Sequence, residues 1–269
     1  MHRIKVVVHG AAGKMGQEVL SALCKAQELE AVGAVDLKAD QDSLLLPNGS
    51  GKIPYSAALE EIIAHCRPDV LVDFTVAEAT MPAARLAAKH GINLVIGTTG
   101  LSPSDIEEIG MLCQKGDVGA VVAPNFSLGA VLMIHLAKLA AKYFDYAEII
   151  EKHHEGKADA PSGTAMATAR AMVEGRGGAF RYPELKKETL GGTRGGQIGG
   201  VSLHSVRLPG LLAHQEVILG ALGQTLTIRH DSISRESFMP GVIMALKRVV
   251  KVKGLIYGLE TLLGLQEAR

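Results

Sequence analysis

The stretch Ile4-Lys5-Val6-Val7-Val8-His9-Gly10-Ala11-Ala12-Gly13-Lys14-Met15-Gly16 decides the fold. A run rich in β-branched residues ends in a glycine-rich turn, and apolar residues at helical spacing follow it. Strand, turn and helix in this order are typical of the opening of a dinucleotide-binding βαβ unit. Gly10 and Gly13 allow backbone N–H groups to approach a pyrophosphate, and Gly16 allows the helix to pack closely on the strand.

A carboxylate ends the next expected strand. Residues 31–35, Ala-Val-Gly-Ala-Val, form a second short run of small and apolar residues, and Asp36 follows it, where a carboxylate is expected to accept hydrogen bonds from the adenosine ribose. Lys38 and Lys14 are placed to meet a ribose 2′-phosphate, so the sequence leaves both NADH and NADPH open as coenzymes. His9 is interpreted as a histidine at a strand end rather than as a catalyst.

The rest of the first half alternates between strands and helices. This alternation predicts a parallel sheet with helices on both faces, and ligands bind at the carboxyl ends of such strands. The polar or small residues that end two of these strands are therefore expected to form the nicotinamide half of the site. We expect strands over 70–75, 94–100 and 120–126, helices over 79–90 and 104–114, and nicotinamide contacts from Gly97, Thr98, Thr99, Ala123, Pro124, Asn125 and Phe126.

The pattern changes after Phe126. A helix over 128–144 precedes a cationic loop, and glycine-rich sequence at 191–196 indicates a further loop. Alternating runs at 202–208, 215–219 and 224–230 then predict an open mixed sheet whose exposed face needs a partner, which favours homo-oligomerisation. A last helix over 237–250 is expected to pack back onto the first domain.

Chemistry concentrates in the segment His153-His154-Glu155-Gly156-Lys157-Ala158-Asp159-Ala160-Pro161-Ser162-Gly163-Thr164-Ala165-Met166. It joins two imidazoles and an ammonium to an expected helix N-terminus, which binds carboxylate or phosphate well. Imidazole is the side chain whose charge ordinarily changes near neutral pH, and an ammonium becomes a proton donor when its surroundings lower its pKa. An exposed cationic loop before a capped helix is the alternative interpretation, and the clustering disfavours it.

Composition limits the other possibilities. The chain has 269 residues, 47% of them hydrophobic, with 28 basic and 28 acidic residues, so no net charge favours nucleic acid or an anionic membrane. It contains no apolar run long enough to span a bilayer and no secretory signal, and we expect a cytoplasmic protein. Cys24, Cys66 and Cys113 lack metal-ligand spacing and are expected to be buried, reduced thiols; no metal site is expected.

These motifs resemble those of the 4-hydroxy-tetrahydrodipicolinate (dihydrodipicolinate) reductase family of lysine and diaminopimelate biosynthesis. The likeness extends over essentially the whole chain and is most specific at Glu151-x-His-His-x-x-Lys157-x-Asp-Ala-Pro-Ser-Gly-Thr-Ala165; Lys14 stands where the family usually has arginine. The resemblance implies reduction of a cyclic dicarboxylate by NADH or NADPH with loss of water, and a homotetramer. It implies that His153 and Lys157 are catalytic, that His154, Gly163 and Thr164 bind substrate, and that Gly10, Ala11, Ala12, Gly13, Lys14, Met15, Asp36 and Lys38 join the nicotinamide residues in binding the coenzyme.

The expected fold is therefore α/β, with a Rossmann-type domain over residues 1–126, joined by a C-terminal helix over 236–269. A second α+β domain with an open mixed sheet covers 127–235 and binds substrate and sister subunits. If the source is a plant, the compartment is the plastid stroma, and the chain shows no transit peptide. Two alternatives lie in other classes: another two-domain amino-acid dehydrogenase, and a non-catalytic NADP-binding regulator. The cluster at 153–166 disfavours both, because the first should lack it and the second does not need proton donors.

Overall fold

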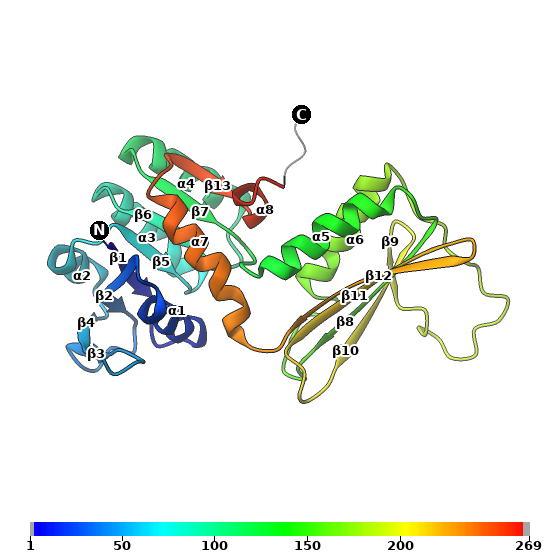
Figure 1. Ribbon diagram of the computed structural model, residues 1–269, viewed down its shortest axis with the longest axis horizontal. Coiled ribbons are helices and arrows are strands. Elements are labelled where there is room, and N and C mark those ends of the chain that lie inside the picture. Colours follow the sequence, from blue (N-terminus) through cyan, green and yellow to red (C-terminus); the bar gives the residue numbers. More distant parts are fainter. Residues whose placement is uncertain (1–2, 266–269) are drawn as a thin grey trace. The chain divides into compact units, whose positions relative to one another are not determined.

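The computed structural model describes residues 3–265 and divides into two compact units (Figure 1). One unit comprises Met1–Leu128 together with Phe238–Arg269, and the other comprises Gly129–Ser237. Each unit has its own sheet and its own helices.

The first unit contains an eight-stranded sheet with the order β13-β7-β6-β5-β1-β2-β4-β3. All neighbouring strands are parallel except β3, which runs antiparallel to β4. The elements are β1 (Ile4–His9), α1 (Lys14–Lys25), β2 (Leu29–Val35), β3 (Ser43–Leu45), β4 (Lys52–Ser56), α2 (Leu59–Cys66), β5 (Val70–Asp73), α3 (Ala77–Lys89), β6 (Asn93–Ile96), α4 (Pro103–Gly116), β7 (Gly119–Val122), α7 (Met239–Val249), β13 (Gly254–Tyr257) and α8 (Leu259–Leu262).

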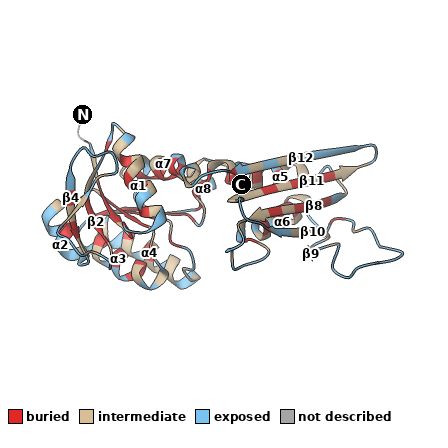
Figure 2. Cartoon of the chain, turned by 90° about the horizontal axis from the view of Figure 1, so that it is seen from below, coloured by how far each residue is buried: buried red, intermediate tan, exposed pale blue. Residues whose placement is uncertain are grey.

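Helices cover both faces of this sheet. Figure 2 shows α1 and α7 on one side of the buried strands and α2, α3 and α4 on the other. Val7 and Leu71, both fully buried, belong to the core beneath α2, α3 and α4. Strands covered on both faces need apolar side chains in both directions, which explains why β1 and β5 are nearly continuous Val and Leu runs. The expected Rossmann-type parallel sheet is confirmed.

The second unit contains a five-stranded mixed sheet with the order β12-β11-β8-β10-β9. Its helices α5 and α6 pack on one face of this sheet (Figure 1), and Ile149, Val217 and Met172 are fully buried between them. The other face carries the alternate residues, among them Ile150 and Ile218, which are half-buried. The elements are α5 (Leu128–Ala141), β8 (Tyr146–His153), α6 (Gly163–Arg176), β9 (Gly196–Ile198), β10 (Val201–Arg207), β11 (Ala213–Ala221), β12 (Gln224–Ser232) and a 3-10 turn η1 (Arg235–Phe238).

The expected C-terminal helix over 236–269 is wrong in part. The α-helix covers only Met239–Val249; the chain then forms β13, which pairs in parallel with β7 at the edge of the first sheet, and the short α8. The last four residues of that range lie outside the described part. Gly254, with a φ of +80°, begins the new strand, and four residues of strand are too few for periodicity to distinguish from a fraying helix.

One smaller expectation, that all three cysteines are buried, also needs correction. Cys24 and Cys66 are half-buried, and Cys113 alone of the three free thiols is fully buried. Elements β3, β4 and α2 occupy a stretch for which the sequence supported no assignment. No helix within residues 3–265 combines the length and the apolar character needed to cross a membrane.

Candidate active site

The glycine turn of the first unit is shaped by close approach. Gly10 has a φ of +83°, a conformation that side chains disfavour, and a Cβ there would lie 2.7 Å from the carbonyl oxygen of Phe74. A Cβ on Gly16 would lie 2.2 Å from the carbonyl oxygen of Gly10. The turn and the first turn of α1 are therefore in contact at a distance that only glycine permits.

This packing leaves the start of α1 open to an anion. Gly13 occupies the N-cap, no side chain caps the helix, and its first turn holds no acidic residue. The unpaired N–H groups and helix dipole of such a terminus attract phosphate. The turn follows β1, which lies between β5 and β2 in the sheet. The strand order reverses at this point, and ligands of this fold class bind there. The residues present thus fit the pyrophosphate of a dinucleotide.

Asp36 ties the loop after β2 to the glycine turn. One carboxylate oxygen accepts the N–H of Ala12 at 2.9 Å, and the other accepts the N–H of Lys38 at 3.0 Å. The side chain of Asp36 is half-buried, and Lys38 is exposed. The structure thus brings together the glycine turn, the expected ribose carboxylate and one of the two expected phosphate-binding lysines.

A buried carboxylate organises the neighbouring strand ends. Asp73, which is 1% exposed, accepts hydrogen bonds from the hydroxyls of Thr75 at 2.7 Å and Thr98 at 2.8 Å and lies 3.1 Å from Nδ1 of His9. Burial acts to raise the pKa of the Asp73 carboxyl, but its hydrogen bonds, first that of His9, outweigh burial and hold the pKa below its ordinary value. His9 is thus a strand-end residue, and Thr98 is fixed by a network that sequence reasoning did not foresee.

The aromatic part of this region is closely packed. A Cβ on Gly97 would lie 2.1 Å from the ring of Phe74, and that ring lies 5.9 Å from the ring of Phe126, centroid to centroid. Phe126 and Ala123 are buried, whereas Thr99 and Pro124 are exposed. The ends of β6 and β7 therefore present small and polar groups beside a rigid apolar support.

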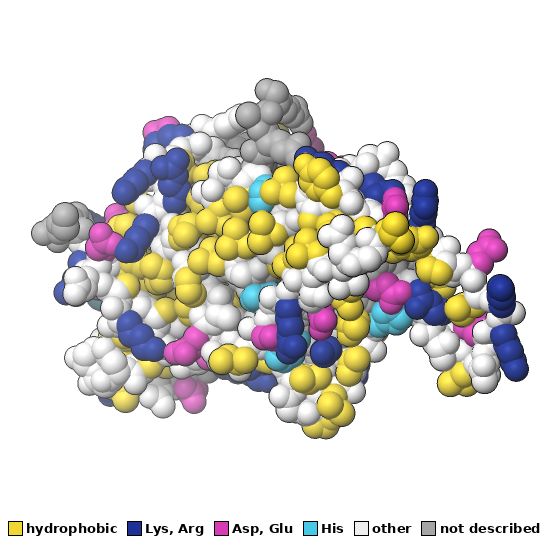
Figure 3. Space-filling model, turned by 45° about the vertical axis from the view of Figure 1, so that its right-hand side comes forward, with side chains coloured by type: hydrophobic (Ala, Val, Ile, Leu, Met, Phe, Trp, Pro, Cys, Tyr) yellow, Lys and Arg dark blue, Asp and Glu magenta, His cyan; other side chains and the backbone are white. Residues whose placement is uncertain are grey.

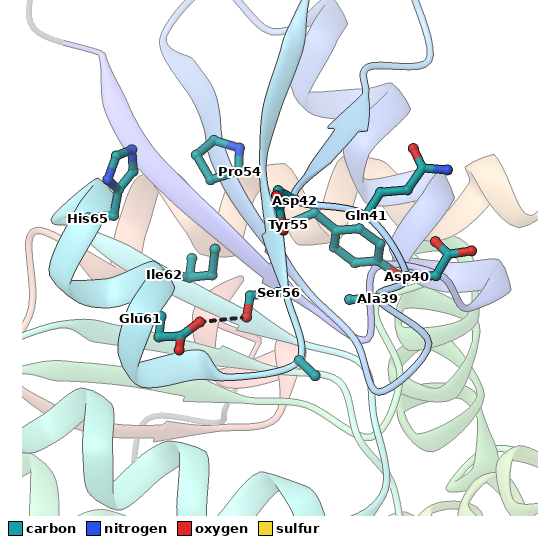
Figure 4. A pocket seen from close by; sticks show the side chains of 11 residues that line it. Ala39, Asp40, Gln41, Asp42, Pro54, Tyr55, Ser56, Glu61, Ile62 and His65 are labelled. Carbon is teal, nitrogen blue, oxygen red and sulfur yellow. Dashed lines mark hydrogen bonds between the residues drawn. The ribbon is translucent and has the colours of Figure 1, made fainter.

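A cavity of about 760 Å³ lies elsewhere in the first unit (Figure 4). It is lined by the loop after Asp36, by β4 and by α2, and Ser56 donates a hydrogen bond to Glu61 there at 2.9 Å. Burial, followed by the charges of Asp36 and Asp40, raises the pKa of Tyr55 on its wall. None of the proton-transfer residues expected from the sequence lines it, so the cavity does not mark the chemical centre.

The second unit brings the cationic cluster together. β8 ends at His153, and the loop that follows carries His154 and Lys157, the backbone N–H of Lys157 donating to the carbonyl oxygen of His154 at 3.2 Å. Lys157 Nζ lies 2.6 Å from Asp159 Oδ1. The charge of Lys157 is therefore already paired with an exposed carboxylate, a partner that the sequence interpretation did not assign.

His153 is held by a carboxylate that is completely buried. Its Nδ1 lies 2.5 Å from Oε2 of Glu151, and the imidazole is 14% exposed. Burial is the largest influence on His153 and lowers the pKa of its imidazole, with the hydrogen bond to Glu151 acting in the opposite direction. Glu151 belongs to the most specific sequence motif, but the sequence indicated no role for it.

Helix α6 begins beside the same loop. Ser162 is its N-cap, and its hydroxyl accepts the N–H of Ala165 at 3.1 Å. The first turn holds no acidic residue, and a Cβ on Gly163 would meet nothing within 4 Å. Gly163 and Thr164 therefore offer backbone N–H groups, and Thr164 also a hydroxyl, in an open position where a carboxylate fits.

Charges elsewhere are mixed. On the face drawn in Figure 3, basic and acidic side chains alternate without a patch of one sign, as the equal counts of 28 and 28 suggest. Within residues 3–265, no group of three or more His, Cys, Asp or Glu side chains is arranged to hold a metal ion. The starts of α1 and α6 and the cationic loop therefore remain the candidate positions for an anion.

Comparison with known proteins agrees with this arrangement. The family model described as dihydrodipicolinate reductase, N-terminus, matches residues 4–126, and the model for the C-terminus of the same enzyme matches residues 129–263. The chain belongs to the dihydrodipicolinate reductase family. As a reductase of this family it is an NAD(P)H-dependent oxidoreductase.

Individual relatives support the assignment of this reductase to the family. It is 58% identical to the 4-hydroxy-tetrahydrodipicolinate reductase of Dehalococcoides mccartyi strain BAV1, over 98% of this chain and 100% of the relative. The corresponding enzyme of Moorella thermoacetica is 51% identical over 97% of this chain and 98% of the relative. The dipicolinate-bound dihydrodipicolinate reductase of Paenisporosarcina sp. TG-14 superposes with a TM-score of 0.86 at 41% identity, covering 96% of this chain and 99% of that one.

Proposed function

We propose that this reductase converts 4-hydroxy-tetrahydrodipicolinate to tetrahydrodipicolinate, with loss of water, in lysine and diaminopimelate biosynthesis. The single observation that carries the proposal is the grouping of His153, Lys157 and the open N-terminus of α6 in the second unit. A cyclic dicarboxylate needs both an anion site and a proton donor, and this group supplies both. The Paenisporosarcina reductase binds dipicolinate, a planar cyclic dicarboxylate of the same size class as the proposed substrate.

The coenzyme is assigned to the first unit. Gly10, Ala11, Ala12, Gly13, Lys14 and Met15 would hold the pyrophosphate, with Asp36 and Lys38 at the adenosine ribose. The nicotinamide end would meet Gly97, Thr98, Thr99, Ala123, Pro124, Asn125 and Phe126. Bound there, the coenzyme supplies a hydride from C4 of the nicotinamide. The close backbone approaches at Gly10 and Gly16, where a Cβ would collide with neighbouring main-chain atoms, give the tight turn that this assignment requires.

Substrate binding is assigned to His154, Gly163 and Thr164. The N–H groups at the start of α6 are not used by a cap other than that of Ser162 and can donate to one carboxylate. His154 follows directly in the chain on His153, and its imidazole can donate to the same anion. These contacts orient the substrate ring and leave its reacting carbon free.

The protons are assigned to His153 and Lys157. Loss of the hydroxyl as water puts a proton on the leaving oxygen and releases a proton from the adjacent ring carbon. Hydride addition to the conjugated imine that results leaves an enamine anion, which must be protonated on carbon, so the two steps together consume one proton besides the hydride. His153 and Lys157 would donate the two protons, and the proton released from the ring carbon restores one of these donors. Their positive charges also stabilise the negative charge that develops on the substrate. The lowered pKa of His153 makes its protonated form a stronger acid.

Coenzyme choice is the finer part of the proposal. The carboxylate of Asp36 favours a free ribose 2′-hydroxyl, whereas Lys38 and Lys14 attract a 2′-phosphate. The carboxylate is fixed by two backbone N–H groups, so it repels a 2′-phosphate steadily, and the attraction of the two lysines acts against this repulsion. We therefore expect both coenzymes to be accepted.

The assembly is proposed to be a homotetramer. The face of the second sheet opposite α5 and α6 carries apolar residues that include Ile150, Val206 and Ile218, and β12 forms its outer edge (Figure 2). Such a face is suited to pairing with other copies. Sedimentation equilibrium should give four times the 28.3 kDa chain mass, and Ile218→Asp should reduce the mass.

The activity is tested with substrate made immediately before use from pyruvate and aspartate semialdehyde by the preceding synthase. Oxidation of NADH and of NADPH is followed by loss of nicotinamide absorbance, with reactions lacking the synthase as the control. Oxidation that depends on synthase product supports the proposal. Oxidation with aspartate semialdehyde alone, or none with either coenzyme, would instead favour another dehydrogenase or a binding protein.

A further inference from the structure

Glu151 lies at a position where the sheet pattern calls for an apolar side chain. β8 alternates between its two faces, and Ile149, Glu151 and His153 share the face that packs against the helices. Ile149 and Glu151 are both 0% exposed. A buried carboxylate is costly unless it is paired and fully hydrogen-bonded. The hydrogen-bond partners of Glu151 therefore indicate its role.

Both carboxylate oxygens of Glu151 are saturated. Oε1 accepts from Arg207 Nη2 at 2.8 Å and from the backbone N–H of Ser162 at 3.2 Å. Oε2 accepts from Arg207 Nη1 at 2.9 Å and lies 2.5 Å from Nδ1 of His153. Planar two-point pairing of this kind fixes direction as well as distance. The carboxylate cannot rotate without breaking several of these bonds.

Arg207 reaches this position through strand pairing. It ends β10, which runs parallel to β8, and it stands in register with His153. Its Nη2 also donates to the carbonyl oxygen of Asp159 at 2.6 Å. Arg207 thus joins the carboxylate, the loop that carries Lys157 and the strand end that carries His153.

We infer that Glu151, clamped by Arg207, is a positioning residue that sets the tautomer and orientation of His153. An ionised carboxylate only accepts hydrogen bonds, so Nδ1 of His153 must donate to it. Neutral His153 then carries its hydrogen on Nδ1 and presents Nε2 for proton exchange. The inference rests on the proposed proton-transfer role of His153.

The same arrangement adjusts the charge of His153. Burial disfavours the imidazolium, and the positive charges of Lys157 and Arg207 disfavour it further, whereas the Glu151 carboxylate favours it. Asp159 is close to both cations: its hydrogen bond with Lys157 and the charges of Lys157 and Arg207 hold the pKa of its carboxyl below the ordinary value. Glu151 is in direct hydrogen-bond contact with His153 and stabilises the protonated ring, so removing its charge should make that ring harder to protonate.

The test combines kinetics with histidine NMR on the full-length enzyme. Glu151→Gln keeps the shape but removes the charge, and kcat should fall by roughly 10- to 100-fold with little change in coenzyme KM. In the same variant the ¹⁵N-monitored titration of His153 should move to lower pH. Glu174→Gln is the matched control, because Glu174 is an exposed carboxylate of the same unit that pairs with Lys138 at 3.1 Å, and neither quantity should change in it.

The wild-type enzyme provides a second readout that does not depend on how a variant folds. Above its titration, the His153 ring should show a protonated Nδ1 and an unprotonated Nε2 in ¹⁵N spectra. The opposite tautomer, or an unchanged His153 titration in folded Glu151→Gln, would overturn the inference. Full activity of His153→Gln alongside the expected spectra would instead refute the proton-transfer proposal while leaving the Glu151 contact intact.

Discussion

Replacing Gly16 by alanine tests whether the close approach of α1 to the glycine turn serves coenzyme binding. The new Cβ would lie 2.2 Å from the carbonyl oxygen of Gly10, whereas ordinary contact begins at 3.4 Å, so the helix and turn must separate by 3.4 − 2.2 = 1.2 Å. The obstacle is backbone, which cannot rotate away as a side chain can. The Gly10 oxygen also accepts the N–H of Gly13 at 3.0 Å, and that bond will be strained.

A separation of this size moves the N–H groups of α1 out of hydrogen-bond range of a pyrophosphate. Losing one such bond to a charged group costs about 1.5–3 kcal/mol, which corresponds to roughly 10- to 100-fold weaker coenzyme binding. Overpacking should also destabilise the fold by about 1–3 kcal/mol. Titration calorimetry with NADH and NADPH measures the first effect, and urea denaturation measures the second.

Gly51→Ala is the matched control, because a Cβ there meets nothing within 4 Å and its backbone is outside the left-handed region. It should change neither quantity appreciably. If Gly16→Ala bound both coenzymes within twofold of wild type and unfolded at the same urea concentration, the close approach would have no role in binding. The assignment of the pyrophosphate to this glycine cradle would then be refuted.

Three further outcomes are expected. His153→Gln and Lys157→Gln should each lower kcat by roughly 10²-fold, whereas His154→Gln should chiefly raise substrate KM, all in steady-state assays; near-normal kcat in both of the first two would contradict their roles. Lys38→Ala should weaken binding of NADPH more than of NADH in calorimetric titrations, and equal losses would place Lys38 away from the phosphate. The pKa of Asp73 is lowered in the folded state, so its contribution to stability is present above the unfolded pKa, near the ordinary 3.8, and is lost as pH falls through the folded pKa. In urea denaturation, Asp73→Asn should therefore be less stable than wild type at pH 7, by a difference that shrinks below pH about 4. A difference in stability that does not depend on pH would count against this.

Much of the first sheet could be predicted from local sequence. The Val-rich strands β1 and β5 are buried on both faces, and a strand in that position needs consecutive apolar residues, a pattern that is visible in the sequence. In the turn Gly10–Gly16, close backbone contacts exclude a Cβ at Gly10 and Gly16, so the glycines themselves indicate the turn. β13 could not be predicted in the same way, because four residues become a strand only through pairing with β7, more than a hundred residues earlier in the chain.

For the candidate site, too, residues close in the sequence could be predicted to lie together, whereas contacts between distant residues could not. His153, His154, Lys157, Gly163 and Thr164 lie within twelve consecutive residues, so the sequence alone brings them together as a group. Proximity in the chain also made the open N-terminus of α6 foreseeable, since Pro-Ser-Gly-Thr is a helix-start pattern.

Only the tertiary structure decided how His153, the proposed proton-transfer residue, is held. Glu151 and Arg207 are 56 residues apart and meet because β8 and β10 pair in parallel with Arg207 in register with His153. His9 and Asp73 meet in the same manner, across 64 residues, at the ends of β1 and β5. Residue types and their local order determined which chemistry the chain carries, whereas strand register determined the contacts of each charge, because hydrogen bonds and ion pairs act over a few ångströms in space irrespective of distance along the chain.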